Sequence, residues 1–120
     1  MLIGVPKEIK VHEYRVGLTP TSVREFIAHG HQVLVETNAG LGIGSSDEVY
    51  RAAGADIAAA PADIFAKADM IVKVKEPQAG ERKLLRPNQI LFTYLHLAPD
   101  PEQTKDLVGG GAVCVAYETV

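Results

Sequence analysis

Short apolar runs alternate along this chain with amphipathic stretches, from residue 2 to residue 116. This alternation is typical of strand and helix units that feed a parallel sheet, because a crossover must carry the chain back before the next parallel strand can begin. The sequence therefore predicts an α/β fold, with a mostly parallel sheet flanked by helices and a Rossmann-like architecture.

The predicted strands cover residues 2–5, 32–36, 56–58, 70–74, 90–94 and 112–116, and the predicted helices cover 20–29, 46–53, 61–67, 81–85 and 101–108. The first helix has the clearest end signals. Thr19 is a good N-cap, Pro20 suits the first helical position, and Gly30 stands where a left-handed terminator belongs. Ser45 and Glu48 have the spacing of a capping box, which predicts the start of the second helix.

Composition points to one domain over residues 1–120, since 47% apolar and 22% charged residues are ordinary for a globular chain. The net charge is -3, and the basic residues are scattered, which argues against nucleic acid or an anionic membrane as a partner. No segment approaches the ~20 apolar residues that span a bilayer, and the N-terminus lacks the features of a signal peptide. The single cysteine, Cys114, is predicted to be a buried, unreactive thiol of a protein in a reducing compartment. We therefore expect a cytoplasmic protein.

Three side chains with useful chemistry follow predicted strands. Arg15 lies in the loop after the first strand, Lys75 directly follows residues 70–74, and His96 comes two residues after 90–94. Ligands bind outside the carboxyl ends of parallel strands, so we expect these three residues at one edge of the sheet. A guanidinium can clamp a carboxylate, an ammonium can donate to a carboxylate or carbonyl oxygen, and an imidazole can move protons near neutral pH. The set predicts a site for a small keto or amino acid.

Each of these residues also has a plainer interpretation. Arg15 and Lys75 could be solvated surface charges, and His96 could be a structural histidine. His29 and His31 flank the expected end of the first helix, where we expect them to cap it. Because no pair of the four histidines has metal-ligand spacing supported by Cys, Asp or Glu on the same element, we predict no metal site.

The glycine-rich segment 40–44 (GLGIG) resembles part of a dinucleotide-binding fingerprint, but it does not complete one. The fingerprint requires a glycine where Ser45 stands, and Gly44 precedes the predicted helix instead of lying inside it. We interpret the segment as a glycine-rich turn, so a nucleotide site is expected beyond Val120.

Four separated motifs resemble the N-terminal part of the alanine dehydrogenase and pyridine nucleotide transhydrogenase family. They are residues 4–8 (GVPKE), 13–20 (EYRVGLTP), 72–77 (VKVKEP) and 93–98 (TYLHLA). The resemblance extends from Met1 to Val120 in the family's order. The resemblance is specific because several separated motifs match together. Alanine dehydrogenase is the more similar branch of the family.

The resemblance implies an NAD-dependent oxidoreductase that interconverts L-alanine with pyruvate and ammonia. Arg15 and Lys75 match the family's substrate-binding positions, and His96 matches its catalytic proton donor and acceptor. Family members bind NAD in a Rossmann domain that follows this region, and they form homo-oligomers, typically hexamers. Their second catalytic acid is an aspartate of that nucleotide domain, so residues 1–120 are expected to be inactive alone.

Two alternatives remain at this point. The nucleotide-binding subunit of transhydrogenase is similar across the same region, but it generally lacks counterparts of Lys75 and His96; saccharopine-type dehydrogenases are more distant. The other alternative is a stand-alone module whose sheet edge binds a small anion. A strand followed by Gly-x-Gly-x-x-Gly downstream would favour an enzyme.

Overall fold

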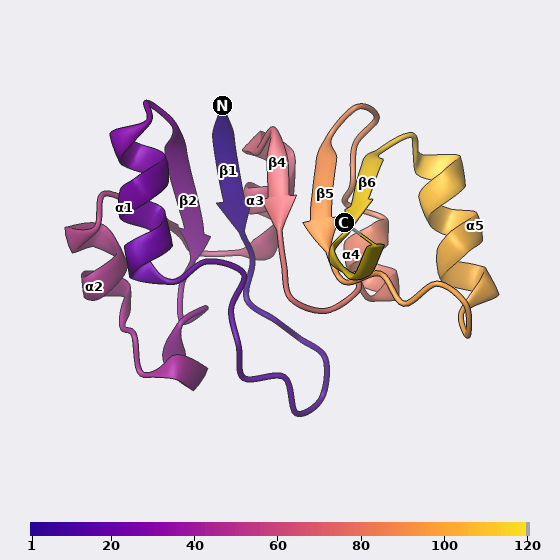
Figure 1. Cartoon of the computed structure of the whole chain (residues 1–120), viewed down its shortest axis with the longest axis horizontal. Coiled ribbons are helices and arrows are strands. Elements are labelled where there is room, and N and C mark those ends of the chain that lie inside the picture. The colour runs from indigo at the N-terminus through magenta and orange to yellow at the C-terminus, as the bar shows by residue number, and fades with distance from the viewer. Residues whose placement is uncertain (120) are drawn as a thin grey trace.

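In the computed structural model, which describes residues 1–119, six strands form one parallel sheet in the order β3-β2-β1-β4-β5-β6 (Figure 1). The strands are β1 (Leu2–Val5), β2 (Gln32–Glu36), β3 (Asp56–Ala58), β4 (Met70–Val72), β5 (Ile90–Thr93) and β6 (Val113–Ala116). The helices are α1 (Pro20–Ala28), α2 (Asp47–Ala52), α3 (Pro61–Lys67), α4 (Ala79–Arg82) and α5 (Pro101–Gly110), with 3-10 turns η1 (Leu41–Ile43) and η2 (Tyr117–Thr119). The predicted α/β, Rossmann-like class is confirmed.

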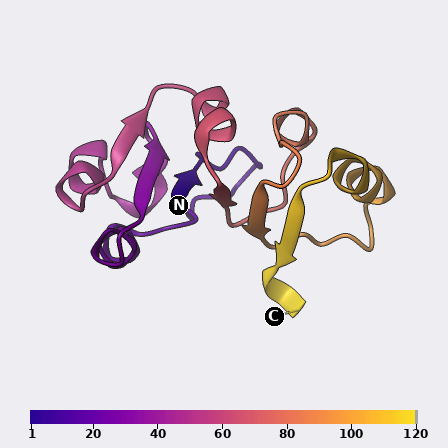
Figure 2. The ribbon, with the colours of Figure 1, turned by 90° about the horizontal axis from the view of Figure 1, so that it is seen from above.

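Helices cover both faces of the sheet, with α1 on one side and α3 on the other (Figure 2). Side chains alternate along β1 and β2, so Ile3, Val5 and Val33 pack with Val23 of α1 in one core cluster. Ile64 of α3 and residues of β4 and β5 belong to a second cluster. Within residues 1–119, no helix is both long and apolar enough to cross a bilayer.

The strand order reverses between β1 and β4, which are neighbours although α1, β2, α2, β3 and α3 separate them in sequence. Such a reversal opens a crevice at the carboxyl edge of a parallel sheet, because the connections on its two sides run in opposite directions. In Figure 1 this edge lies at the bottom, where the long segment after β1 hangs below the sheet.

Two strands end earlier than the sequence predicts, and hydrogen bonding explains both differences. β4 ends at Val72 instead of residue 74, because the carboxylate of Glu8 accepts the N–H groups of Val74 and Lys75. β5 ends at Thr93 instead of residue 94, and the next free donor, the N–H of Leu95, binds the Glu118 carboxylate. Side chains thus bind donors just beyond both strand ends, although the Tyr94 N–H still donates to the Val74 carbonyl oxygen at 3.2 Å.

Helix and strand ends show smaller differences. The predicted capping box at Ser45 is wrong: Ser46 caps α2 by accepting from the Val49 N–H, and Glu48 pairs with Arg51. The helix expected at 81–85 starts earlier, at Ala79, because a capping box forms there between Gln78 and Glu81.

At the other end of the chain, α5 continues through two glycines beyond residue 108 and stops at Gly111, which has a φ of 74°. The last strand accordingly begins at Val113. The end of α1 agrees with expectation for His29, whose Nδ1 lies 2.8 Å from the Glu25 carbonyl oxygen. His31 instead contacts the N-terminal amine of Met1 at 3.1 Å.

Candidate functional site

The candidate site lies at the carboxyl edge of the sheet, where the segment 6–19 between β1 and α1, called the arm below, passes beneath the strand ends (Figure 1). Arg15 belongs to the arm, Lys75 follows β4, and His96 follows β5. Because these strands are parallel and lie in the order β1-β4-β5, the three residues leave the same edge, with Lys75 on the middle strand.

Two close approaches of the backbone hold the arm on either side of Arg15. A Cβ added to Gly17 would lie 2.4 Å from the Val72 carbonyl oxygen, so only glycine lets the arm reach the end of β4. A Cβ added to Gly42 would lie 2.1 Å from the Tyr14 carbonyl oxygen. The arm therefore packs closely against the glycine-rich turn after β2. Arg15 lies between this contact and the contact of Gly17 with the end of β4.

Arg15 is bound to Glu13 of the same arm. Its Nε and one Nη donate to the two Glu13 carboxylate oxygens at 3.0 and 2.8 Å. The Arg15 side chain is 59% exposed, whereas that of Glu13 is 4% exposed. The hydrogen bonds from Arg15 lower the pKa of Glu13 to about 2, and the bond to Glu13 raises the pKa of Arg15. The guanidinium turns one edge to Glu13 and still has Nη hydrogens for a second carboxylate.

Lys75 contributes to lowering the pKa of Glu13 through its charge, although Arg15 contributes more. Its main chain is held on both sides. The Lys75 N–H donates to Glu8 at 3.0 Å, and its carbonyl oxygen accepts from the Thr93 hydroxyl at 2.9 Å. The ammonium group therefore extends from a fixed peptide, a requirement for a residue that orients a small ligand.

His96 occupies a strained position after β5. Its φ is 49°, a left-handed conformation that costs a non-glycine residue energy and is often found at functional sites. Both carboxylate oxygens of Glu118 support this turn, accepting from the N–H groups of Leu95 at 3.1 Å and His96 at 3.0 Å. The bond from Leu95 is the main reason why the pKa of Glu118 is lowered. The imidazole is exposed and lines a cavity of about 320 Å³.

Arg15 and His96 line separate hollows, and Lys75 lines neither of them. Arg15 lines a cavity of about 270 Å³ between the arm and the turn after β2. His96 lines the other cavity with Ala116 and Glu118, and neither cavity contains all three side chains. Joint action of the three on one ligand stays a prediction.

Sequence reasoning missed several residues of this edge. Glu8 and Glu13 were within the recognised motifs but had no assigned role, and only the fold shows what they hold. Tyr94 also lies near the site: its charge affects the pKa of Arg15, and its ring meets Tyr117 edge to face at 4.8 Å. Glu13 lies two residues before Arg15, which was the available signal for it, whereas Glu8 is 67 residues from Lys75 and had no local signal.

The described residues do not form a cradle for a dinucleotide. A pyrophosphate cradle needs a tight glycine turn that leads from a strand directly into a helix N-terminus, but β1 is followed by the long arm. At the glycines after β2, Gly42 is occupied by the Tyr14 backbone. In residues 1–119 there is likewise no cluster of three or more His, Cys, Asp or Glu side chains suited to a metal ion.

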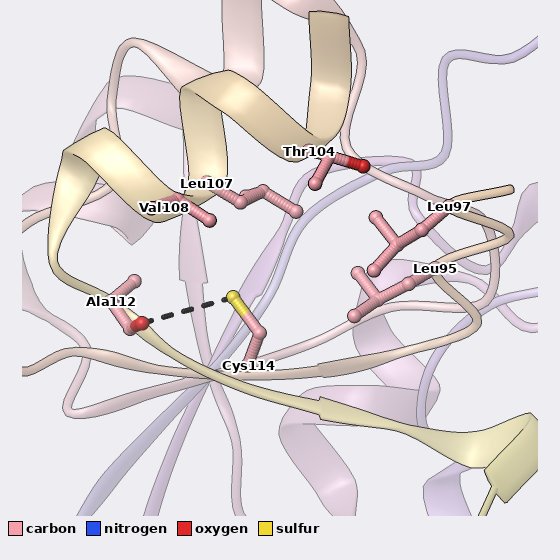
Figure 3. Close-up of a pocket in the computed structure, with 7 residues that line it drawn as sticks. All are labelled: Leu95, Leu97, Thr104, Leu107, Val108, Ala112 and Cys114. Atoms are coloured by element: carbon pink, nitrogen blue, oxygen red, sulfur yellow. Dashed lines mark hydrogen bonds between the residues drawn. The ribbon is translucent and has the colours of Figure 1, made fainter. Parts of the chain in front are cut away.

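A further hollow of about 220 Å³ lies between α5 and β6 and is lined mainly by apolar side chains (Figure 3). Cys114 borders it and is half-buried, where the sequence predicted a buried thiol. Burial raises the pKa of this thiol, which disfavours the reactive thiolate. The cysteine thus gives no indication of a nucleophile.

Comparison with known proteins identifies the family of the chain. The family described as "Alanine dehydrogenase/PNT, N-terminal domain" matches residues 4–120. An alanine dehydrogenase of Methanococcus maripaludis is 54% identical over 120 residues, which are 100% of this chain and 32% of that protein. The chain thus spans about a third of the length of that relative.

Two solved structures resemble the fold closely. One, named L-alanine dehydrogenase, matches with a TM-score of 0.95 and 49% identity over 98% of this chain and 32% of its own. The other, a transhydrogenase from Sinorhizobium meliloti, matches with a TM-score of 0.92 and 30% identity over 98% of this chain and 35% of its own. Both contain a copy of this sheet within a longer protein. The chain belongs to the alanine dehydrogenase/PNT N-terminal domain family.

Proposed function

We propose that this chain is the substrate-binding part of an NAD-dependent alanine dehydrogenase, which interconverts L-alanine with pyruvate and ammonia. The observation that carries the proposal is that Arg15, Lys75 and His96 all follow strands at one carboxyl edge of the sheet, in a chain 54% identical to a protein named alanine dehydrogenase. A site with two cations at a sheet edge suits a small carboxylic acid.

The charges of Arg15, Glu13 and Lys75 suit an anionic ligand. Glu13 stays ionised at neutral pH because its pKa is about 2, so it balances the charge of Arg15. Of these three side chains, Lys75 then carries the unbalanced positive charge. Arg15 would hold the carboxylate through its remaining Nη hydrogens, and Lys75 would donate to a carboxylate or carbonyl oxygen and stabilise negative charge there.

His96 would move the protons. An imidazole has an unperturbed pKa of about 6.5, so it can both accept and donate a proton close to neutral pH. The Glu118 carboxylate holds the backbone of His96 in its left-handed turn, so the ring leaves the strand end in a defined direction. Proton transfer at the amino or carbonyl group of the substrate is the role that this placement supports.

The remaining components of the enzyme would lie outside residues 1–119. Since these residues form no dinucleotide cradle, NAD would be held by other parts of the complete protein, which would also close the site over Arg15 and His96. We propose a cytoplasmic homo-oligomer, a hexamer by family resemblance, and expect residues 1–120 to be inactive alone.

The transhydrogenase structure supports a second candidate function, the N-terminal part of a transhydrogenase nucleotide-binding subunit. Lys75 and His96 favour the dehydrogenase, because a transhydrogenase has no amino acid to bind. The complete protein distinguishes the two. Oxidation of NADH that depends on pyruvate and ammonium supports the dehydrogenase, whereas hydride exchange between NADPH and NAD without any acid supports the transhydrogenase.

The role of His96 is tested in the same assay. We expect His96→Ala to abolish pyruvate reduction while NADH binding stays nearly unchanged, because the imidazole would act on the substrate. His29→Ala is the matched control, since that exposed histidine lies at the end of α1. Near-normal pyruvate reduction by His96→Ala would refute the assignment.

A further inference from the structure

A buried cluster of three charges contacts the backbone of Lys75. The Lys73 ammonium is 3.2 Å from a carboxylate oxygen of Glu8 and 3.2 Å from one of Glu81. The side chains of Lys73, Glu8 and Glu81 are 1%, 2% and 6% exposed. Lys73 directly follows β4 and Glu81 belongs to α4, so the cluster joins this part of the chain to Glu8 of the arm, which is distant in sequence.

Stability alone is a weak reason for such a cluster. Removing three charges from water carries a large desolvation penalty, and well-packed apolar residues often replace buried ion pairs without loss of stability. The substrate contacts proposed above do not use any of these three residues. Their arrangement around the Lys75 backbone suggests a different role.

Glu8 is the member of the cluster that touches Lys75. One carboxylate oxygen accepts the Lys75 N–H at 3.0 Å, and the other accepts the Val74 N–H at 3.1 Å and contacts Lys73. With the Thr93 hydroxyl on the Lys75 carbonyl oxygen, the peptide is held from both directions. Glu8 also lines the cavity that contains Arg15.

We propose that Glu8 is a positioning residue that fixes the direction of the Lys75 ammonium relative to Arg15, while Lys73 holds the Glu8 carboxylate in place. This inference rests on the proposed role of Lys75 in binding pyruvate. A carboxylate is needed at this position because both oxygens must accept hydrogen bonds. An amide would turn an N–H donor towards one of the two backbone donors.

The substitution Glu8→Gln in the complete protein tests the proposal, with Glu81→Gln as the matched control. Each substitution removes one carboxylate next to Lys73 and leaves the other. Glu81, however, uses its second oxygen to accept the Gln78 N–H at 2.9 Å and does not contact the Lys75 backbone.

We expect Glu8→Gln to raise the KM for pyruvate about tenfold without changing the affinity for NADH, because a displaced ammonium loses ligand contacts. Glu8→Gln and Glu81→Gln should lower the thermal midpoint by similar amounts. Glu81→Gln, however, should leave the KM for pyruvate nearly unchanged. Equal KM values for the two variants would overturn the proposal. If Glu8→Gln does not fold, Glu8→Asp replaces it: this variant keeps the charge but shortens the reach by one methylene, and it should raise the KM severalfold.

A double-mutant cycle with Lys75→Ala separates this inference from the proposed function. If Glu8 acts through Lys75, Glu8→Gln adds little to the KM of Lys75→Ala, and the two effects are strongly non-additive. Additive effects would mean that Glu8 does not act through Lys75. A normal pyruvate KM in Lys75→Ala itself would instead refute the proposed substrate contact.

Discussion

Glu118 accepts a hydrogen bond from the backbone N–H of His96 at 3.0 Å, at a residue whose φ is 49°. A carboxylate that follows β6 thus supports a strained turn that follows β5. A left-handed conformation costs a non-glycine residue on the order of 1–3 kcal/mol, so it persists only where neighbouring groups hold it. The relationship makes Glu118 a support for the proposed proton-transfer residue.

Replacing this carboxylate should affect turnover more than stability. We expect Glu118→Ala in the complete protein to lower kcat for pyruvate reduction about tenfold, because His96 would relax from its turn. The affinity for NADH should not change. Glu102→Ala is a suitable control, since that exposed carboxylate lies in the first turn of α5. An unaltered kcat in Glu118→Ala would show that His96 needs no such support.

Loss of the arm's guanidinium should weaken substrate binding without unfolding the protein. We expect Arg15→Ala to raise the KM for pyruvate about tenfold or more, and Arg15→Lys to restore only part of it, because lysine lacks the two-pronged geometry. The thermal midpoint should fall modestly, because the substitution leaves the Glu13 carboxylate, which is 4% exposed, without its ion-pair partner. Steady-state kinetics and thermal unfolding check both points. Arg24→Ala on α1 serves as control, and a normal KM in Arg15→Ala would exclude the clamp.

Replacing glycine by alanine should have opposite effects on stability at Gly42, which contacts the arm, and at Gly109, which lies in α5. Gly42→Ala should destabilise the protein by about 1–3 kcal/mol, because the new Cβ would overlap the Tyr14 carbonyl oxygen. The arm would also move, so the KM for pyruvate should rise. Gly109→Ala should stabilise α5 by about 0.5–1 kcal/mol, because its Cβ meets open space and alanine favours helix. Denaturant unfolding measures the free energy of unfolding of both variants. Equal changes in the two variants would contradict the close contact between the arm and Gly42.

Acid should destabilise the arm through Glu13. Its folded pKa of about 2 is lower than the ordinary glutamate value of 4.5, so the ion pair with Arg15 is fully stabilising above pH 4.5. That contribution disappears as the pH falls from 4.5 through 2, because the folded state must then take up the proton. We expect Glu13→Gln to flatten the loss of stability over this interval, as measured by unfolding at a series of pH values. An unchanged slope would mean that Glu13 does not contribute.

The order of strands and helices is determined by the sequence itself. Local signals such as Thr19 before Pro20 act within a few residues, and apolar periodicity needs no distant partner, so the α/β class could be predicted. The edge on which Arg15, Lys75 and His96 lie also follows, because the carboxyl ends of parallel strands share one side. Where local signals competed, as at Ser45 and Ser46, the predicted helix start was one residue early.

Only the tertiary structure decides what holds those side chains. Glu8 is 66 residues from Val74, and Glu118 is 22 residues from His96, so neither hydrogen bond can be read from local sequence. The ends of β4 and β5 follow from the same contacts, because a carboxylate takes the N–H that a neighbouring strand would otherwise bind. Such contacts exist only once the strands lie side by side, where long-range packing brings a donor within reach of an acceptor.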